Sequence, residues 1–121
     1  MTSEDLKKRT KLFAINVIHF SKMLPKNDEG FIIKKQLIRC ATSVGANYRA
    51  VCRARSSADF ISKLAIVEEE ADETCFWLEV LEESGMISKE SVAKLYDEST
   101  QLTAIFSASR KTSRMNNDKY K

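Results

Sequence analysis

Two stretches, Leu37-IRCATSVGANYRA-Val51 and Asp59-FISKLAIVEEEADETCFWLEVL-Glu82, decide the fold of this chain. In each of them apolar residues recur three and four positions apart, which is the spacing of an amphipathic helix. Each stretch also carries a second patterned face. In the first stretch this face consists of basic residues with small residues at its centre, and in the second it consists of apolar residues between acidic ones. A surface helix needs one buried stripe, so the second faces indicate contacts beyond a simple core.

Two more helical patterns flank these stretches, and together they predict an all-α fold. We expect helices over about residues 3–24, 31–53, 56–85 and 88–110. Pro25 stops the first helix, and Gly85 ends the third in a left-handed cap. Because the connections are short, the pattern predicts an antiparallel up-down four-helix bundle.

The composition is that of a single globular domain. Of the 121 residues, 43% are hydrophobic and 31% charged, so one core is feasible and general disorder is not expected. We assign residues 1–111 to the bundle and residues 112–121 to a basic, flexible C-terminal tail. No apolar run approaches the ~20 residues that cross a bilayer. The polar, acidic N-terminus lacks a signal-peptide pattern, so we expect a cytoplasmic protein without membrane contact.

Charge is segregated along the chain. The segment Asp59–Glu83 holds nine acids and one base, a net charge of −8. The rest of the chain holds 19 bases and 8 acids, a net charge of +11. Such segregation can steer assembly or attract a polyanion.

The basic residues form three clusters, in the first helix, around the end of the second, and near the end of the fourth. In an up-down bundle all three clusters share one pole, where they would build a positive field for phosphate backbones of RNA or DNA. The alternative is that these bases only solvate helix surfaces and ends. The candidate nucleic-acid-binding residues are Lys7, Lys8, Lys11, Arg49, Arg53, Arg55, Arg110, Lys111 and Arg114.

A second group of polar residues suggests a structural network. Glu70 and Glu73 can pair with a base such as Arg39 or Lys63, inside the bundle or across a subunit boundary. For Asn47 we favour a buried amide bonded to polar groups of the third helix over a ligand contact. Gly45, costly inside a helix, indicates a close approach of two helices.

No residue set carries the pattern of a metal, cofactor or catalytic site. A di-metal bundle site needs two Glu-x-x-His motifs, and His19 is the one histidine. The cysteines at positions 40, 52 and 75 stand singly, which favours buried reduced thiols. No serine or cysteine has a neighbouring base to activate it, so we expect no enzyme activity, metal or cofactor.

The second faces of the two central helices are the candidate oligomer interface. The third helix has more apolar circumference than three sibling helices can cover. We therefore expect the chain to form a homo-oligomeric ring. The candidate interface residues are Lys35, Arg39, Ala46, Ile66, Phe76, Trp77 and Val80.

The two central stretches also resemble a known family, the four-helix bundle proteins linked to 23S ribosomal RNA intervening sequences. The shared residues are Leu37, Arg39, Ala41, Ser43, Val44, Gly45, Ala46 and Asn47, then Asp59, Phe60, Ile61, Lys63, Leu64, Ile66, Glu70, Ala71, Glu73, Thr74, Phe76, Trp77 and Leu78. Many members continue with acidic residues after Gly-Ala-Asn. This chain has Tyr48-Arg49-Ala50-Val51 there, which makes its surface more basic.

The resemblance implies a fold and an assembly rather than an activity. It implies a ring-like homopentamer, and a similarity to the accessory proteins of diversity-generating retroelements, which engage reverse transcriptase and nucleic acid. Two functions remain open at this point. One is a non-enzymatic RNA-binding or scaffold protein, and the other is a protein-interaction adaptor whose ring surface holds a partner enzyme without direct nucleic-acid binding.

Overall fold

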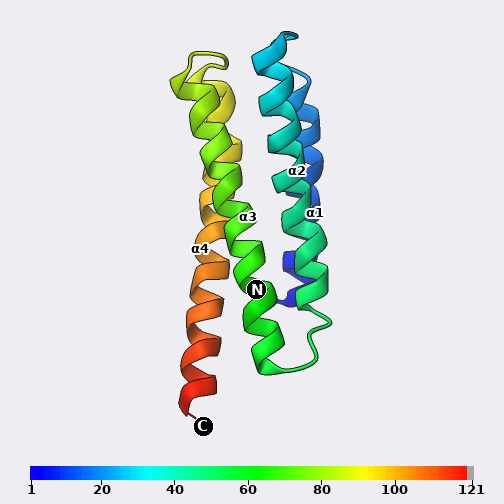
Figure 1. The fold of residues 1–121 in the computed structure, drawn as a ribbon, viewed down its shortest axis with the longest axis vertical. Helices are drawn as coiled ribbons and strands as arrows, with labels where there is room; N and C mark the ends of the chain where they lie inside the picture. The colour runs from blue at the N-terminus through cyan, green and yellow to red at the C-terminus, as the bar shows by residue number, and fades with distance from the viewer. Residues whose placement is uncertain (120–121) are drawn as a thin grey trace.

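The computed structural model describes the backbone of residues 1–119 and the side chains of residues 1–117. Four helices make up this part of the chain: α1 (Ser3–Ser21), α2 (Asp28–Val51), α3 (Ser57–Glu83) and α4 (Lys89–Lys119). No strand occurs among these residues, so the predicted all-α, four-helix fold is confirmed. The α1–α2 and α3–α4 connections lie at one end of the molecule and the α2–α3 connection at the other (Figure 1).

A polar residue caps the start of each of the first three helices. Thr2 caps α1 in a capping box with Asp5, whose backbone N–H donates to the Thr2 hydroxyl oxygen. The Asn27 side chain accepts a hydrogen bond from the N–H of Gly30, and the Ser56 side chain accepts one from the N–H of Asp59. These bonds satisfy backbone donors that a helix start leaves free.

One boundary differs clearly from the prediction. Residues 112–121 were expected to form a flexible tail, but α4 continues through this segment to Lys119. Residues 120 and 121 of the predicted tail lie outside the described residues. The segment contains no glycine or proline to end the helix, so helix propensity outweighs its polarity.

The end of α3 depends on a left-handed glycine. Gly85 has a φ of 78°, the one positive value in the described chain. Other residues pay a steric penalty in this conformation because their Cβ approaches the backbone. The turn therefore follows from the glycine, as predicted.

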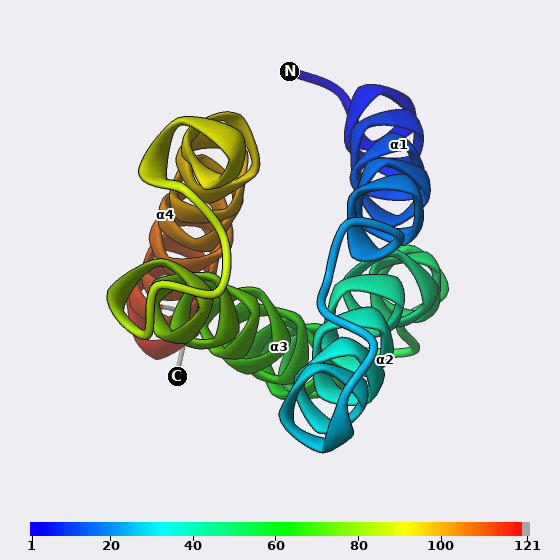
Figure 2. The ribbon, with the colours of Figure 1, turned by 90° about the horizontal axis from the view of Figure 1, so that it is seen from above.

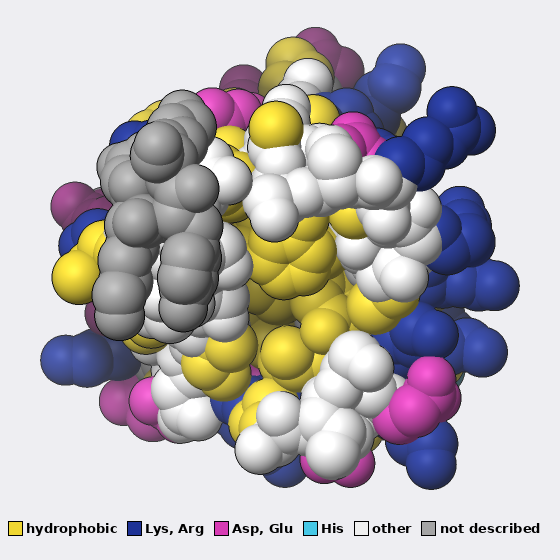
Figure 3. Space-filling model, turned by 90° about the horizontal axis from the view of Figure 1, so that it is seen from below, with side chains coloured by type: hydrophobic (Ala, Val, Ile, Leu, Met, Phe, Trp, Pro, Cys, Tyr) yellow, Lys and Arg dark blue, Asp and Glu magenta, His cyan; other side chains and the backbone are white. Residues whose placement is uncertain are grey.

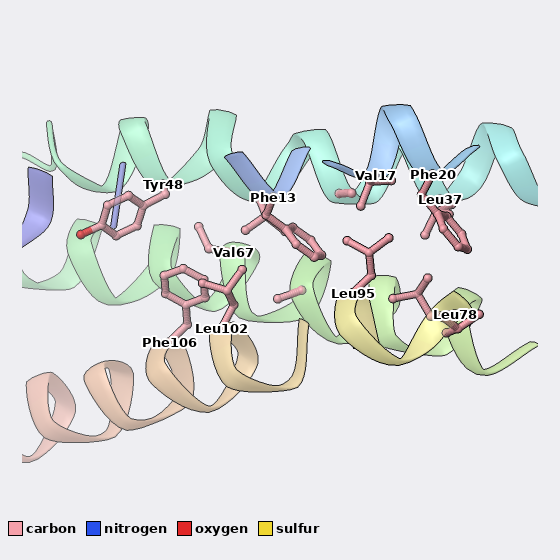
Figure 4. Packing of buried hydrophobic residues seen from close by; sticks show 14 of the residues in the cluster. Phe13, Val17, Phe20, Leu37, Tyr48, Val67, Leu78, Leu95, Leu102 and Phe106 are labelled. Carbon is pink, nitrogen blue, oxygen red and sulfur yellow. The ribbon is translucent and has the colours of Figure 1, made fainter. Parts of the chain in front are cut away.

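The core lies along the inner stripes of all four helices. Phe13 and Val17 of α1, Leu37 of α2, Leu78 of α3 and Phe106 of α4 are all at most 1% exposed. Figure 4 shows these side chains converging between the helices. The buried residues of α1, α2 and α3 recur mostly three or four positions apart, which places them on one face of each helix.

Gly45 brings α1 and α2 into close contact. A Cβ placed on Gly45 would lie 3.4 Å from the backbone oxygen of Thr10 and 3.6 Å from the nitrogen of Lys11. The close approach predicted from this glycine is confirmed. It sets the middle of α1 directly beside the second half of α2.

The bundle is least closed between α1 and α4. Consecutive helices pack along their lengths, whereas α1 and α4 touch far less (Figure 2). Arg9 spans this seam, since its Nε and Nη2 donate to the two carboxylate oxygens of Glu98 at 2.8 and 2.7 Å. Its Nη2 also donates to the Gln101 side chain at 2.9 Å. One bidentate pair thus links the first helix to the last.

The cysteines are only partly as predicted. Cys40 and Cys75 are buried free thiols, and burial raises the pKa of both. Cys52 is exposed, so the expectation of a third buried thiol is wrong. It is the C-cap residue of α2, where the helix leaves the core.

Candidate functional site

The basic residues of α1 and α2 form one continuous surface. We call Lys7, Lys8, Lys11, Arg49 and Arg53 the basic face. Lys7 and Lys11 are four residues apart on one side of α1, and Arg49 and Arg53 are four residues apart at the end of α2 and just beyond it. The contact of Gly45 with Thr10 and Lys11 sets the two pairs side by side, because Arg49 follows Gly45 by one turn.

Most cations of the basic face are available to a partner. Lys8, Lys11, Arg49 and Arg53 are exposed, and no ion pair engages them within the described residues. Lys7 is half-buried and pairs with Glu4 at 3.1 Å. Seen from the end that holds the α2–α3 connection, Lys and Arg gather along the side formed by α1 and α2 (Figure 3).

Arg55 lies in the α2–α3 connection, beside the basic face in sequence. Its side chain is exposed, and its backbone N–H donates to the Asp59 carboxylate at 3.0 Å. Asp59 also accepts from Lys63 at 2.9 Å, and these bonds lower the pKa of Asp59. Asp59 thus bonds to the Arg55 backbone and to Lys63, and the Arg55 guanidinium forms no salt bridge within the described residues.

The cations of α4 are in a different situation. Arg110 is half-buried and donates to Glu68 of α3, with Nε 2.5 Å from Oε2. The guanidinium lowers the pKa of the Glu68 carboxyl. Lys111 and Arg114 are exposed, but α4 stands across the open seam from α1 (Figure 2). The predicted clusters therefore share an end of the molecule but not one surface, and Arg110 is neutralised.

The predicted polar network is partly present. Arg39 of α2 contacts Glu70 at 3.1 Å and also pairs with Glu73, both on α3 of the same chain. Asn47 is half-buried, and its Nδ2 donates to the carbonyl and hydroxyl oxygens of Ser43 at 2.9 and 3.2 Å. The expectation that Asn47 bonds to the third helix is therefore wrong. Its side chain turns back onto its own helix because Ser43 stands one turn earlier.

The candidate interface residues divide by exposure. Ile66 is 44% and Phe76 53% exposed, and Lys35, Arg39 and Ala46 are exposed as well. Trp77 and Val80 are half-buried against the core. Phe76 and Trp77 meet edge to face, with ring centroids 4.9 Å apart. The buried Trp77 Nε1 has no hydrogen-bond partner among the described residues. The outer face of α3 thus leaves large apolar area uncovered.

The described part of the chain holds no group of three His, Cys, Asp or Glu side chains arranged to bind a metal ion. None of its helices is long and apolar enough to cross a membrane. The carboxylates of α3 instead pair with bases, as Glu68, Glu70 and Glu73 do.

The comparisons with known proteins assign a family. A family model described as 23S rRNA-intervening sequence protein matches residues 3–108. The chain belongs to this family. A solved structure from Bacteroides thetaiotaomicron VPI-5482, a protein with unknown function from the S23 ribosomal protein family, is 34% identical. The match covers 92% of this chain and 99% of that one, with a TM-score of 0.83. No curated protein matches significantly.

One ion pair between helices of this family member was not predicted from the sequence. Arg9 was left out of every candidate group, yet it links α1 to α4 through Glu98. A signal was present in the pattern, because Arg9 flanks the apolar stripe between Leu6 and Phe13. Its partner lies 89 residues away, and only the tertiary structure pairs the two.

Proposed function

We propose that this 23S rRNA-intervening sequence protein is a non-enzymatic RNA-binding scaffold, assembled from up-down bundles into a homopentameric ring. One observation supports the RNA-binding part of this proposal. Four exposed cations of the basic face, Lys8, Lys11, Arg49 and Arg53, have no acidic partner within the described chain. When such unpaired cations contact phosphates, they displace the counterions condensed on the nucleic acid, so the binding affinity depends on the salt concentration.

The charge of the first half of the chain supports this proposal. Residues 1–55 hold twelve bases and four acids, a net charge of +8. The four acids, Glu4, Asp5, Asp28 and Glu29, all lie in the first turns of α1 and α2. The middle and end of both helices therefore carry a field of one sign, which attracts polyanions.

The ring has separate support in α3. Ile66 and Phe76 are exposed on a helix whose segment Asp59–Glu83 carries a net charge of −8. A neighbouring copy can offer Lys35 and Ala46 of α2 as a complementary basic and small-residue surface. Contacts of this head-to-tail kind close into rings when the rotation permits.

The RNA proposal is tested by fluorescence anisotropy with a short labelled RNA across a salt series. The wild-type affinity should fall steeply between about 50 and 200 mM salt. Charge reversal of Lys11, Arg49 and Arg53 to Glu should weaken binding and reduce the log–log salt slope by ~2, since each single-strand phosphate contact contributes ~0.7. The matched control reverses Lys89, an exposed cation at the opposite end. Binding without salt dependence would contradict the proposal.

The ring is tested by light scattering with Phe76→Arg. Phe76 is 53% exposed, so this change removes an intermolecular contact while leaving the core of the protomer in place. Trp77 is a poorer target because it packs against the core. The wild type should scatter as a pentamer and the variant as smaller species. A wild type of 13.8 kDa in solution would reject the ring.

The adaptor function is the second candidate. It is favoured by apolar side chains on the outer side of α1, where Leu12 is 57%, Ile15 42% and Ile18 41% exposed. Exposed apolar patches of this kind mark protein contacts. A partner retained after nuclease treatment, and released by Ile15→Glu but not by Lys8→Glu, would support the adaptor in place of the RNA scaffold.

A further inference from the structure

A hollow opens at the end of the bundle that holds the α2–α3 connection. Its volume is about 740 Å³, and all four helices and the α2–α3 connection contribute to its wall. Figure 3 looks into it and shows a hydrophobic floor inside a largely polar rim. Ligand sites for small organic groups typically occupy about 300–1,000 Å³. The hollow therefore has room for a nucleobase.

The floor suits a flat aromatic ring. Tyr48, Val51 and Phe60 line the hollow. Tyr48 packs on Phe106 with ring centroids 5.6 Å apart, and its hydroxyl points away from the core toward this end of the bundle (Figure 4). Burial, with a smaller contribution from Cys52, raises the pKa of Tyr48 to about 12. The phenol thus stays protonated at neutral pH and can donate a hydrogen bond.

The rim supplies groups that read the edges of bases. Asn116 and Asn117 of α4 line the hollow, together with Ser113 one turn earlier. A carboxamide both donates and accepts, so it matches the paired donor and acceptor edge of a base such as adenine. Side chains of this kind beside an apolar floor are typical of sites for unpaired bases.

The hollow also adjoins the cations proposed to hold phosphates. Arg55 lines it, and Arg53 of the basic face lies two residues earlier. Both side chains are exposed. A base that enters the hollow would therefore keep its own phosphates beside cations.

We propose that this hollow receives an unpaired base of an RNA strand whose phosphates lie on the basic face. The inference rests on the proposed RNA binding and adds a site with its own chemistry. Stacking on the half-buried Phe60 supplies affinity, while the Asn side chains and the Tyr48 hydroxyl bond the base edge. A base stacked on an aromatic side chain contributes ~1–3 kcal/mol.

The test compares oligoadenylate with a phosphodiester strand of equal length that lacks bases. Wild-type protein should bind oligoadenylate about ten-fold tighter, which corresponds to ~1.4 kcal/mol. The double variant Ser113→Leu with Asn117→Leu adds apolar bulk on the α4 side of the hollow without adding an aromatic face. In this variant the two strands should bind equally, at the affinity of the base-free strand.

The matched control is Ala108→Leu with Thr112→Leu, two exposed positions of α4 outside the hollow. It should keep the ten-fold preference, and thermal unfolding should show both variants folded. An unchanged preference in the Ser113→Leu, Asn117→Leu variant would overturn the base site while leaving RNA binding intact. No binding of either strand by the wild type would remove the proposed function, and this site with it. Adenosine monophosphate that competes as strongly as the oligonucleotide would overturn the assignment to a bound strand.

Discussion

The first two helices and the last two use their cations differently. Residues 1–55 carry twelve bases and four acids, whereas residues 56–121 carry eight bases and thirteen acids. Arg49 of α2 and Arg53 just beyond the end of α2 are exposed, while Arg110 of α4 is held by Glu68. The residue type is the same in both halves, and the neighbouring helix decides whether the charge is available to a ligand.

The difference also extends to how the helices meet. Gly45 lets α1 and α2 approach backbone to backbone. Between α3 and α4 the contact includes buried polar side chains, since the Ser99 hydroxyl donates to the Ala71 carbonyl at 3.1 Å and lies 3.0 Å from Cys75 Sγ. The α1–α2 contact thus depends on the absence of a side chain at Gly45, whereas the α3–α4 contact includes hydrogen-bonded side chains.

The largest expected effect separates the two basic regions. Reversal of Lys11, Arg49 and Arg53 to Glu should lower RNA affinity about 100-fold at low salt, because three phosphate contacts become repulsive. Reversal of Lys111 and Arg114 on α4 should lower it much less. Anisotropy titrations measure both. Equal losses of RNA affinity would show that the cations of α4 contribute as much to binding as the basic face does, and would contradict the difference between the two halves.

The second effect concerns the close approach in the first half. Gly45→Leu should destabilise the protein by about 1–3 kcal/mol, because the added side chain meets the Thr10 backbone. Gly45→Ala is the control, since its Cβ makes an ordinary contact at 3.4 Å and helix propensity improves by ~1 kcal/mol. Urea unfolding gives both values. Similar stabilities for the two variants would mean that α1 moves away at little cost.

The third effect concerns the seam between the halves. Arg9→Gln should cost about 1 kcal/mol, because it removes a bidentate, partly buried pair with Glu98. Amide exchange should speed up in α1 more than in α3, since α1 has few other contacts with α4. Lys8→Gln, at an exposed cation without an ion pair, is the control. Unchanged exchange in α1 would show that the core alone holds this helix.

The smallest effect depends on pH and belongs to the second half. Arg110 lowers the folded-state pKa of Glu68 below its usual 4.5. A carboxylate with a depressed pKa stabilises the fold above that usual value, and this contribution disappears as the pH falls through the folded pKa. The Tm of Arg110→Gln should therefore lie slightly below that of the wild type at pH 7 and equal it in acid. Lys89→Gln, which removes an exposed cation at the opposite end of the molecule, should show no such pH dependence. A Tm difference between Arg110→Gln and the wild type that persists in acid would exclude the linkage.

Much of the fold could be predicted because its signals are local. The caps at Thr2, Asn27 and Ser56 satisfy donors within three residues, and Gly85 needs no partner to adopt its positive φ. The apolar stripes likewise identify core residues by spacing alone. The end of α4 was the exception, since no residue near 111 stops the helix.

The candidate site was harder to predict because its signals are distant. Arg110 was expected beside Arg53 at one pole, although Arg110 pairs with Glu68 of α3. Asn47 was expected to bond to α3, although its hydrogen-bond partner is Ser43 of its own helix. Each error concerns which neighbour a polar side chain finds, and several partners compete for one donor.

The sequence by itself determined four helices, the core stripes and the segregation of charge, because these depend on spacing and on bonds between near neighbours. Only the tertiary structure decided that Arg9 joins α1 to α4, that Arg110 is neutralised, and that a hollow opens beside Arg55. The physical reason is that charge pairing and concave surfaces depend on the distance between helices far apart in the chain. Helical periodicity states which face a residue occupies, but not what lies opposite it.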